Sequence, residues 1–107
     1  MIQIIALKTF DRAVKKLMSK ADIEALASLL RHNPEEGVVV KGSGGIRKMR
    51  WAADKGKSGG LRIIYFYQDN RGRIFLITAY SKNQKKDLTD AEVNALKKLT
   101  SQLNGEE

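Results

Sequence analysis

Two β-branched and aromatic runs, joined by a short polar turn, restrict what this chain can fold into. They cover residues 61–67 and 73–80, and Asp69-Asn70-Arg71-Gly72 lies between them. Runs of this composition around a polar turn predict a β-hairpin. Because an isolated hairpin is at best marginally stable in water, further strands or helices must pack against it.

Helical spacing replaces the β pattern in the first third of the chain. Apolar side chains recur at helical intervals in two groups, which are Phe10, Ala13, Val14, Leu17 and Met18, then Ile23, Leu26, Ala27 and Leu30. Thr9 before the first group, and Ser19 followed by Asp22 before the second, predict helix N-caps. His32-Asn33-Pro34 ends the second helix, because the residue before a proline avoids the α region. Two adjacent helices of this kind predict a helical hairpin.

Three shorter strands and one helix complete the expected fold. The strands are residues 2–7, 38–40 and 46–51, and Thr89 with Glu92 predicts the capping box of a C-terminal helix. We expect an α+β fold in the order β-α-α-β-β-β-β-α: an N-terminal strand and helical hairpin, then a mainly antiparallel β-sheet and a C-terminal helix. The helices are expected to cover one face of the sheet. No repeat or linker interrupts the chain, so residues 1–107 are expected to form a single domain.

Positive charge is concentrated in the middle of the chain. The sequence has 20 Lys and Arg residues against 12 Asp and Glu residues, a net charge of +8. Residues 41–62 contribute +6 of that total, because they hold seven basic residues and one acid, Asp54. The basic residues are Lys41, Arg47, Lys48, Arg50, Lys55, Lys57 and Arg62. This concentration favours a polyanionic partner such as RNA or the ribosome.

The residue types that the chain lacks exclude several kinds of chemistry. It has no cysteine and His32 is its single histidine, which excludes zinc sites and Cys-His catalysis. His32 is expected to be structural, at a helix end. We expect no metal and no cofactor. No apolar run is long enough to span a membrane and the N-terminus has no leader pattern, so a cytoplasmic protein without a membrane partner is expected.

Aromatic residues are interleaved with the basic cluster, a combination that favours an RNA-phosphate site. Lys48 and Arg50 are two apart on an expected strand and therefore point to the same face. Arg62 begins a later strand, while Tyr80 and Lys82 close another, so adjacent strands could bring these groups together. RNA carries its own nucleophile, the 2′-hydroxyl, and an enzyme needs only to position it, move protons and stabilise the phosphate. A metal-independent ribonuclease built from Lys, Arg and Tyr is therefore chemically possible.

Three runs in the chain resemble those of the RelE/HigB toxins, within the RelE/ParE superfamily. They are Gly42-Ser43-Gly44-Gly45-Ile46-Arg47-Lys48-Met49-Arg50-Trp51, Gly59-Gly60-Leu61-Arg62-Ile63-Ile64-Tyr65 and Thr78-Ala79-Tyr80-Ser81-Lys82-Asn83. The HigB-type toxins share the patterns G-x-G-G-[IL]-R-K-x-R and G-G-x-R-I-I-Y-[YF]. The resemblance covers nearly the whole chain, because the order of elements also matches.

The resemblance implies a toxin of a type II toxin–antitoxin pair. Such toxins enter the ribosomal A site and cleave mRNA there, as ribosome-dependent endoribonucleases that inhibit translation. The implied partners are the ribosome, mRNA and a cognate antitoxin with a helix-turn-helix DNA-binding domain. Operator DNA is an implied partner only through that antitoxin.

The resemblance also implies roles for individual residues. Lys48, Arg50 and Arg62 match positions that hold and polarise the phosphate, and Lys82 matches a basic residue that is a candidate base or acid. The residues expected to bind RNA or the ribosome are Lys41, Arg47, Lys55, Lys57 and Lys85.

One departure from the family leaves the acid and base open. Well-studied RelE members have an arginine and a tyrosine after the last strand, where this chain has Asn83 and Thr89. Tyr80 or Lys85 are the alternatives that could substitute for them.

Two other functions are compatible with the same fold or the same charges. A ParE-like toxin that inhibits gyrase would not require the cluster of Lys48, Arg50 and Arg62. A non-catalytic RNA- or ribosome-binding protein would use the same basic surface and bind in a salt-sensitive way without cleavage.

Overall fold

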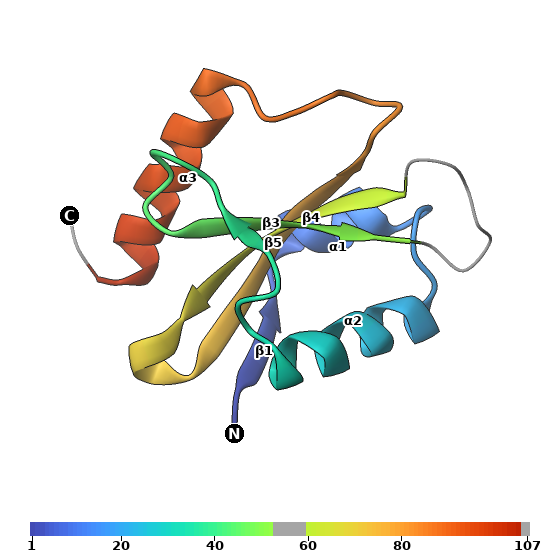
Figure 1. Ribbon diagram of the computed structural model, residues 1–107, viewed down its shortest axis with the longest axis horizontal. Coiled ribbons are helices and arrows are strands. Elements are labelled where there is room, and N and C mark those ends of the chain that lie inside the picture. Colours follow the sequence, from blue (N-terminus) through green and yellow to red (C-terminus); the bar gives the residue numbers. More distant parts are fainter. Residues whose placement is uncertain (53–59, 106–107) are drawn as a thin grey trace.

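A five-stranded β-sheet forms the centre of the computed structural model, which describes residues 1–52 and 60–105 (Figure 1). The strands are β1 (Gln3–Ala6), β2 (Val38–Val39), β3 (Ile46–Trp51), β4 (Leu61–Gln68) and β5 (Arg73–Ser81). The helices are α1 (Lys8–Val14), α2 (Lys20–His32) and α3 (Asp90–Leu103), with a 3-10 turn, η1 (Asp69–Arg71), between β4 and β5. This order confirms the expected α+β fold. No helix in the described ranges is long and apolar enough to cross a membrane.

The sheet has the strand order β1-β5-β4-β3-β2. β1 runs parallel to β5 at one edge, and the other described pairs are antiparallel, which confirms a mainly antiparallel sheet. The predicted hairpin of β4 and β5 turns through η1 and Gly72, which has a φ of 61°. Glycine reaches this left-handed region without steric cost, so it suits the end of the turn.

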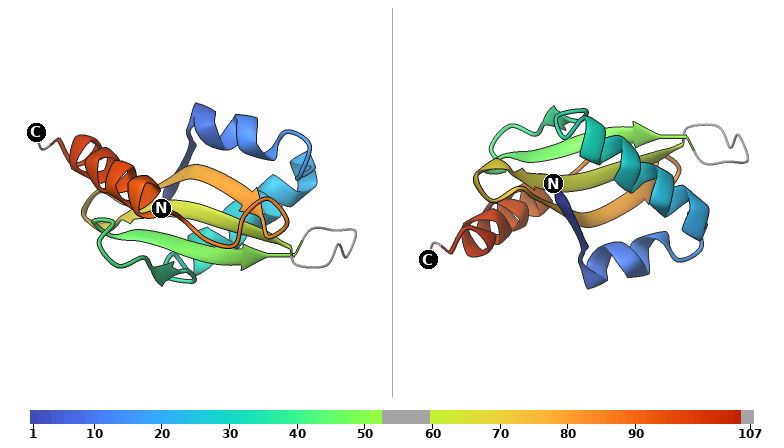
Figure 2. Two further views of the ribbon diagram at one scale, coloured as in Figure 1. Left: turned by 90° about the horizontal axis from the view of Figure 1, so that it is seen from above. Right: turned by 90° about the horizontal axis from the view of Figure 1, so that it is seen from below.

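The helices cover both faces of the sheet, and the expectation that they cover one face was wrong. The first core cluster joins α1 and α2 to one face, where Ile63 is buried, and the second joins α3 to the other face, where Ile64 is buried. Figure 2 shows α3 in front of the sheet in one view and α2 in front of it in the opposite view. Because the neighbouring residues Ile63 and Ile64 are both fully buried, β4 is apolar on both faces, and a strand of this kind needs cover on both sides.

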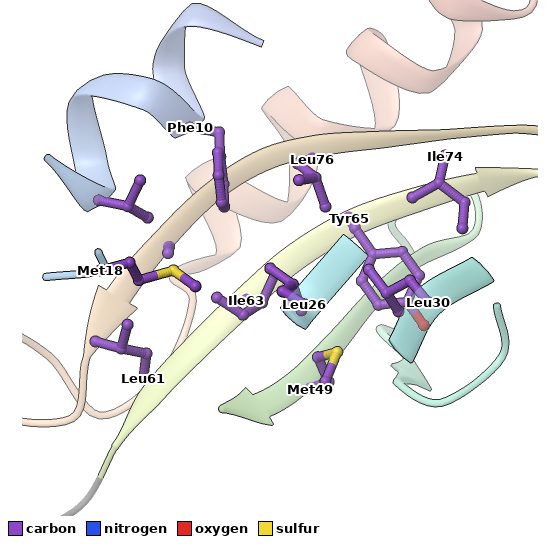
Figure 3. Close-up of a cluster of buried hydrophobic side chains, with 12 residues drawn as sticks. Phe10, Met18, Leu26, Leu30, Met49, Leu61, Ile63, Tyr65, Ile74 and Leu76 are labelled. Carbon is purple, nitrogen blue, oxygen red and sulfur yellow. The ribbon is translucent and has the colours of Figure 1, made fainter. Parts of the chain in front are cut away.

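Tyr65 ties the first core cluster to the loop that follows α2 (Figure 3). Its side chain is fully buried. The hydroxyl donates a hydrogen bond to the Pro34 carbonyl at 2.7 Å and accepts one from the Gly37 N–H at 2.8 Å. A Cβ added at Gly37 would lie 2.9 Å from Tyr65 Cε1. The glycine therefore leaves room for the ring, and the buried hydroxyl has both of its hydrogen bonds.

The helix starts confirm two of three predicted caps. Ser19 with Asp22 forms the capping box of α2, and Thr89 with Glu92 forms that of α3. The N-cap predicted at Thr9 was wrong, because α1 begins at Lys8 with Leu7 as its N-cap and the Thr9 hydroxyl donates to the Ile77 carbonyl of β5. A threonine that packs beside a strand can donate its hydroxyl to a carbonyl of that strand. The partner of the Thr9 hydroxyl therefore could not be predicted from the local sequence.

The glycine-rich turn before β3 packs closely against α3. The buried Ser43 hydroxyl donates to the Val40 carbonyl at 2.6 Å and accepts from the Ile46 N–H at 3.0 Å. Gly44 has a φ of 78°, and a Cβ there would lie 2.4 Å from Thr100 Oγ1. The turn needs glycine both for its backbone conformation and for the close approach of the helix.

Candidate functional site

Three residues of the predicted site lie side by side on the face of the sheet that α3 covers. Arg62 of β4 pairs in register with Arg50 of β3 on one side and with Tyr80 of β5 on the other. Leu61 and Ile63 pack in the first core cluster, so the intervening Arg62 points to the opposite face. Directly opposed residues on neighbouring strands have Cβ atoms roughly 5 Å apart, which puts their side chains within reach of one another.

A β-bulge turns Tyr80 toward this face. Ile64 pairs with Thr78 whereas Tyr65 pairs with Leu76, so β5 has one extra residue, Ile77, at this point. Strict alternation from Leu76, in the first cluster, would place Tyr80 on the same face as Leu76. Tyr80 instead packs in the second cluster. Bulges commonly re-aim side chains beside functional sites, and this one aligns Tyr80 with Arg62.

Lys48 joins the group from β3, where it lies two residues before Arg50 on the same face. Its ammonium forms an ion pair with the carboxylate of Asp87, with Nζ and Oδ1 2.8 Å apart. Asp87 belongs to the segment between β5 and α3, which leads back over the sheet (Figure 1). The hydrogen bond from Lys48, together with one from the Leu88 N–H at 2.8 Å, lowers the pKa of Asp87 below its ordinary value of 3.8.

Tyr80 has a buried hydroxyl without a hydrogen-bond partner among the described residues. The residue is 4% exposed, and the Lys85 Nζ lies over its ring, 5.0 Å from the centroid. Burial raises the pKa of Tyr80, the negative charge of nearby Asp87 raises it further, and the positive charge of Arg62 opposes the rise. The Asp87 carboxylate is close enough to act through its charge, but its geometry falls short of a hydrogen bond. Tyr80 is therefore a protonated phenol at neutral pH.

Lys85 also pairs with the first turn of α3. Its ammonium donates to the carboxylate of Glu92, the residue that closes the capping box with Thr89. These contacts, with the hydrogen bond from Lys85 as the largest cause, lower the pKa of Glu92 below its ordinary value of 4.5. The carboxylate thus stays charged near neutral pH and fixes Lys85 above Tyr80.

The structure gathers part of the predicted site and leaves other members apart. Its gathered members, which we call the strand site, are Lys48, Arg50, Arg62, Tyr80 and Lys85. Lys82 is exposed immediately after β5. Lys41 is exposed in the turn at the far end of β3 from Arg50. Lys55 and Lys57 lie outside the described residues.

Arg47 lies on the other face of β3 from Lys48. Its guanidinium donates to the Gly37 carbonyl at 2.7 Å and pairs with the Glu35 carboxylate, whose Oε2 is 3.6 Å from Nη2. These contacts hold the Arg47 side chain against the loop after α2, the same loop that the Tyr65 hydroxyl contacts. The alternation of β3, which puts Arg47 with Met49, was already visible in the sequence.

Sequence reasoning missed Asp87 and Glu92 as neighbours of the site. Asp87 follows Lys85 and Lys86, and Glu92 belongs to an expected capping box, so the sequence predicts a solvated acid and a capping acid. The one available signal was the capping box of Thr89 and Glu92, since it fixes where α3 begins and hence how the preceding segment must return.

The strand site can bind an anion and deliver a proton. Arg62 lies opposite Tyr80 in register and Lys85 lies over its ring, while Arg50 and Lys48 lie on β3, on the other side of β4. Guanidinium suits the geometry of phosphate. Among residues 1–52 and 60–105, no group of three His, Cys, Asp or Glu residues could hold a metal ion.

Comparisons with solved structures define the class of this fold. The E. coli RelE toxin in the intact RelBE toxin–antitoxin complex has a TM-score of 0.56 and 18% sequence identity, covering 76% of this chain and 96% of that chain. The isolated E. coli RelE toxin in its P21 crystal form has a TM-score of 0.56 and 16% identity, covering 92% of this chain and 99% of that chain. The fold is therefore that of the RelE toxins.

The sequence gives the family itself. Residues 2–107 match the family described as the RelE toxin of the RelE / RelB toxin-antitoxin system. The chain belongs to the RelE toxin family and is a toxin of a toxin–antitoxin system. The resemblance inferred from the three sequence runs is thereby confirmed.

Proposed function

We propose that the protein is a ribosome-dependent mRNA endonuclease that inhibits translation. The observation that carries the proposal is the register of the central strands, which sets Arg50, Arg62 and Tyr80 side by side with Lys48 on the same face. A row of cations beside a protonated phenol suits an RNA phosphate that must be held and cleaved.

The reaction is attack of the RNA 2′-hydroxyl on the adjacent phosphorus, with loss of the 5′-oxygen of the next nucleotide. Arg62 and Arg50 stabilise the negative charge that grows on the phosphate oxygens, as preorganised donors do in other enzymes. Tyr80 donates its proton to the leaving oxygen, since its phenol is protonated at neutral pH. Because the nucleophile belongs to the RNA and the charge is met by arginine, the proposed reaction is independent of metal ions and cofactors.

The proton acceptor in this proposal is a lysine. Lys48 lies on the sheet face where the phosphate is proposed to bind. Lys85 lies over Tyr80, and Lys82 is exposed just after β5. Lys48 is the base that we favour, because it lies two residues from Arg50 on the same face of β3, beside the proposed position of the phosphate. Lys85 then serves to hold Tyr80 in place.

The proposed partners follow from this activity and from the family. The toxin acts in the cytoplasm as a single domain on mRNA in the ribosomal A site. A cognate antitoxin with a helix-turn-helix domain neutralises it and provides its contact with operator DNA. Membership of the RelE toxin family, which is described by its RelE / RelB toxin-antitoxin system, supports the proposal of a cognate antitoxin.

Primer extension on an mRNA in a reconstituted translation system, with and without ribosomes, tests the proposal. We expect cuts inside codons that appear only when both the protein and ribosomes are present. Intact mRNA with arrested translation would instead indicate a ribosome-binding protein without nuclease activity. Intact mRNA with normal translation would contradict both and point to gyrase assays for a ParE-like toxin.

A further inference from the structure

A carboxylate of the chain itself already pairs with one cation of the strand site. Asp87 Oδ1 accepts a hydrogen bond from Lys48 Nζ at 2.8 Å. The same oxygen accepts the Leu88 N–H at 2.8 Å, so the carboxylate is held in place from its own segment as well as from β3. Within the described residues, three ion pairs are formed, and two of them join a lysine of the strand site to an acid near the start of α3.

Asp87 also lies beside the group that would donate the proton. Its negative charge acts on the Tyr80 hydroxyl, which is buried and has no hydrogen-bond partner among the described residues. A buried hydroxyl without a partner is costly, and such groups in native proteins often serve a bound ligand. One carboxylate is thus placed against both Lys48 and Tyr80, the groups that an RNA phosphate would contact.

We infer that Asp87 occupies the phosphate position of the strand site, as an internal anion that an incoming phosphate must displace. This inference rests on the proposed nuclease function. A carboxylate and a phosphate oxygen are alike as acceptors of charge-assisted hydrogen bonds, so Lys48 can exchange one for the other. Tyr80 is 4% exposed and lies under Lys85, so the segment that carries Lys85 and Asp87 must move before phosphate reaches the phenol.

The pairing is weak enough for a ligand to displace it. The Lys48 side chain is 31% exposed and that of Asp87 is 62% exposed. Exposed ion pairs contribute little, and the corresponding competition changes the affinity of a displacing ligand by about two- to fivefold. Asp87 therefore reduces binding of stray anions without closing the site to RNA that the ribosome presents at high local concentration.

Inorganic phosphate is a suitable probe, because it is an anion without the rest of the RNA. Its dissociation constant would be measured by NMR, from the shifts of Lys48 and Tyr80 resonances, in the wild-type protein and in two variants. Asp87→Asn keeps the size of the side chain and removes its charge. Asp90→Asn is the matched control, since it makes the same charge change on an exposed residue of the first turn of α3 that forms no ion pair in the described structure.

We expect phosphate to bind Asp87→Asn about two- to fivefold more tightly than it binds wild type. The phosphate affinity of Asp90→Asn should stay close to that of wild type. Asp87→Glu keeps a carboxylate, so its phosphate affinity should also be close to that of wild type. Equal affinities in wild type and Asp87→Asn would overturn the inference, as would an equal gain in Asp90→Asn or no shift of these resonances in any protein.

Failure of this inference and failure of the nuclease proposal give different results. Cleavage of mRNA by a wild-type protein whose phosphate affinity does not change in Asp87→Asn would remove the role of Asp87 alone. Tighter phosphate binding by Asp87→Asn without any mRNA cleavage by wild type would keep the anion site and remove the nuclease.

Discussion

Tyr65 and Tyr80 lie on neighbouring central strands and bury their phenol rings on opposite faces of the sheet, but only Tyr65 has hydrogen bonds for its hydroxyl within the described structure. The Tyr65 hydroxyl joins two backbone groups of the loop after α2. The Tyr80 hydroxyl is buried beside Arg62 and Asp87. The difference separates a tyrosine that stabilises the fold from one that is available for chemistry.

Tyr65→Phe should destabilise the protein without changing its activity. The substitution leaves the Gly37 N–H buried without its acceptor, and an unsatisfied buried donor costs about 1–3 kcal/mol. Urea denaturation would measure the loss, and mRNA cleavage by the folded variant should match wild type. Unchanged stability would mean that the hydroxyl contributes nothing to holding the loop.

Tyr80→Phe should have the opposite effect. Removing a hydroxyl that has no partner should leave the free energy of unfolding unchanged or raise it by up to about 1 kcal/mol. Loss of the general acid should slow mRNA cleavage by about 10²-fold or more. The same urea and cleavage assays apply, and a folded variant that cleaves at the wild-type rate would remove Tyr80 from the chemistry.

Arg62→Ala should abolish most of the cleavage, because it removes the central donor to the phosphate. The expected loss is about 10²-fold or more in rate. Arg71→Ala is a matched control, since Arg71 is exposed in η1 at the far end of β4, roughly 20 Å along the strand from Arg62. Similar losses in the two variants would show that total positive charge, and not the position of Arg62, is what matters.

Gly44→Ala should destabilise the turn before β3 more than Gly42→Ala does. Both glycines have nearly the same φ, 78° and 79°, so alanine has the same backbone strain of about 1 kcal/mol at each. At Gly44 the new Cβ also meets Thr100 Oγ1 at 2.4 Å, while at Gly42 the nearest atom, of Val93, is 3.9 Å away. Thermal denaturation of the two variants should therefore give a lower Tm for Gly44→Ala, and equal Tm values would argue against the close packing of α3.

The contribution of Glu92 to stability should depend on pH. Its pKa is lowered in the folded protein, so its stabilising effect is present above its ordinary pKa of 4.5 and is lost as the pH falls through the lowered value. Glu92→Gln should cost about 0.2–1 kcal/mol at neutral pH, as expected for an exposed pair with Lys85. Denaturation of both proteins at neutral pH and at about pH 2 should show the difference shrinking in acid, and a difference that is constant with pH would rule out the ion pair as its source.

The sequence predicted the elements well, because most of them depend on local patterns. Two capping boxes fixed the starts of α2 and α3, and alternation along β3 placed Lys48 and Arg50 on one face. Alternation along β5 failed at the bulge beside Ile77, which depends on the pairing with β4 and has no local signature. Tyr80 could therefore be nominated for the site, but its alignment with Arg62 could not be derived.

Long-range placement explains the other differences. Local sequence predicts that Thr9 is a helix cap and that Asp87 is a solvated acid. In the structure the Thr9 hydroxyl instead donates to a carbonyl of β5, and the segment that leads to α3 brings Asp87 to Lys48. Both contacts join residues far apart in the chain. The position of α3 on the second face follows from β4 being apolar on both sides, which a hairpin pattern alone leaves open.

The most direct test of the central claim is cleavage of an mRNA that carries a single 2′-deoxynucleotide. The substitution is made on the 5′ side of a mapped cleavage position, in the reconstituted translation system, and the products are compared with those from the all-ribose mRNA. If the strand site positions the 2′-hydroxyl for attack, cleavage at that position should disappear while other positions are still cut. Cleavage at the wild-type rate beside the 2′-deoxynucleotide would contradict the account, because the nucleophile would then come from elsewhere.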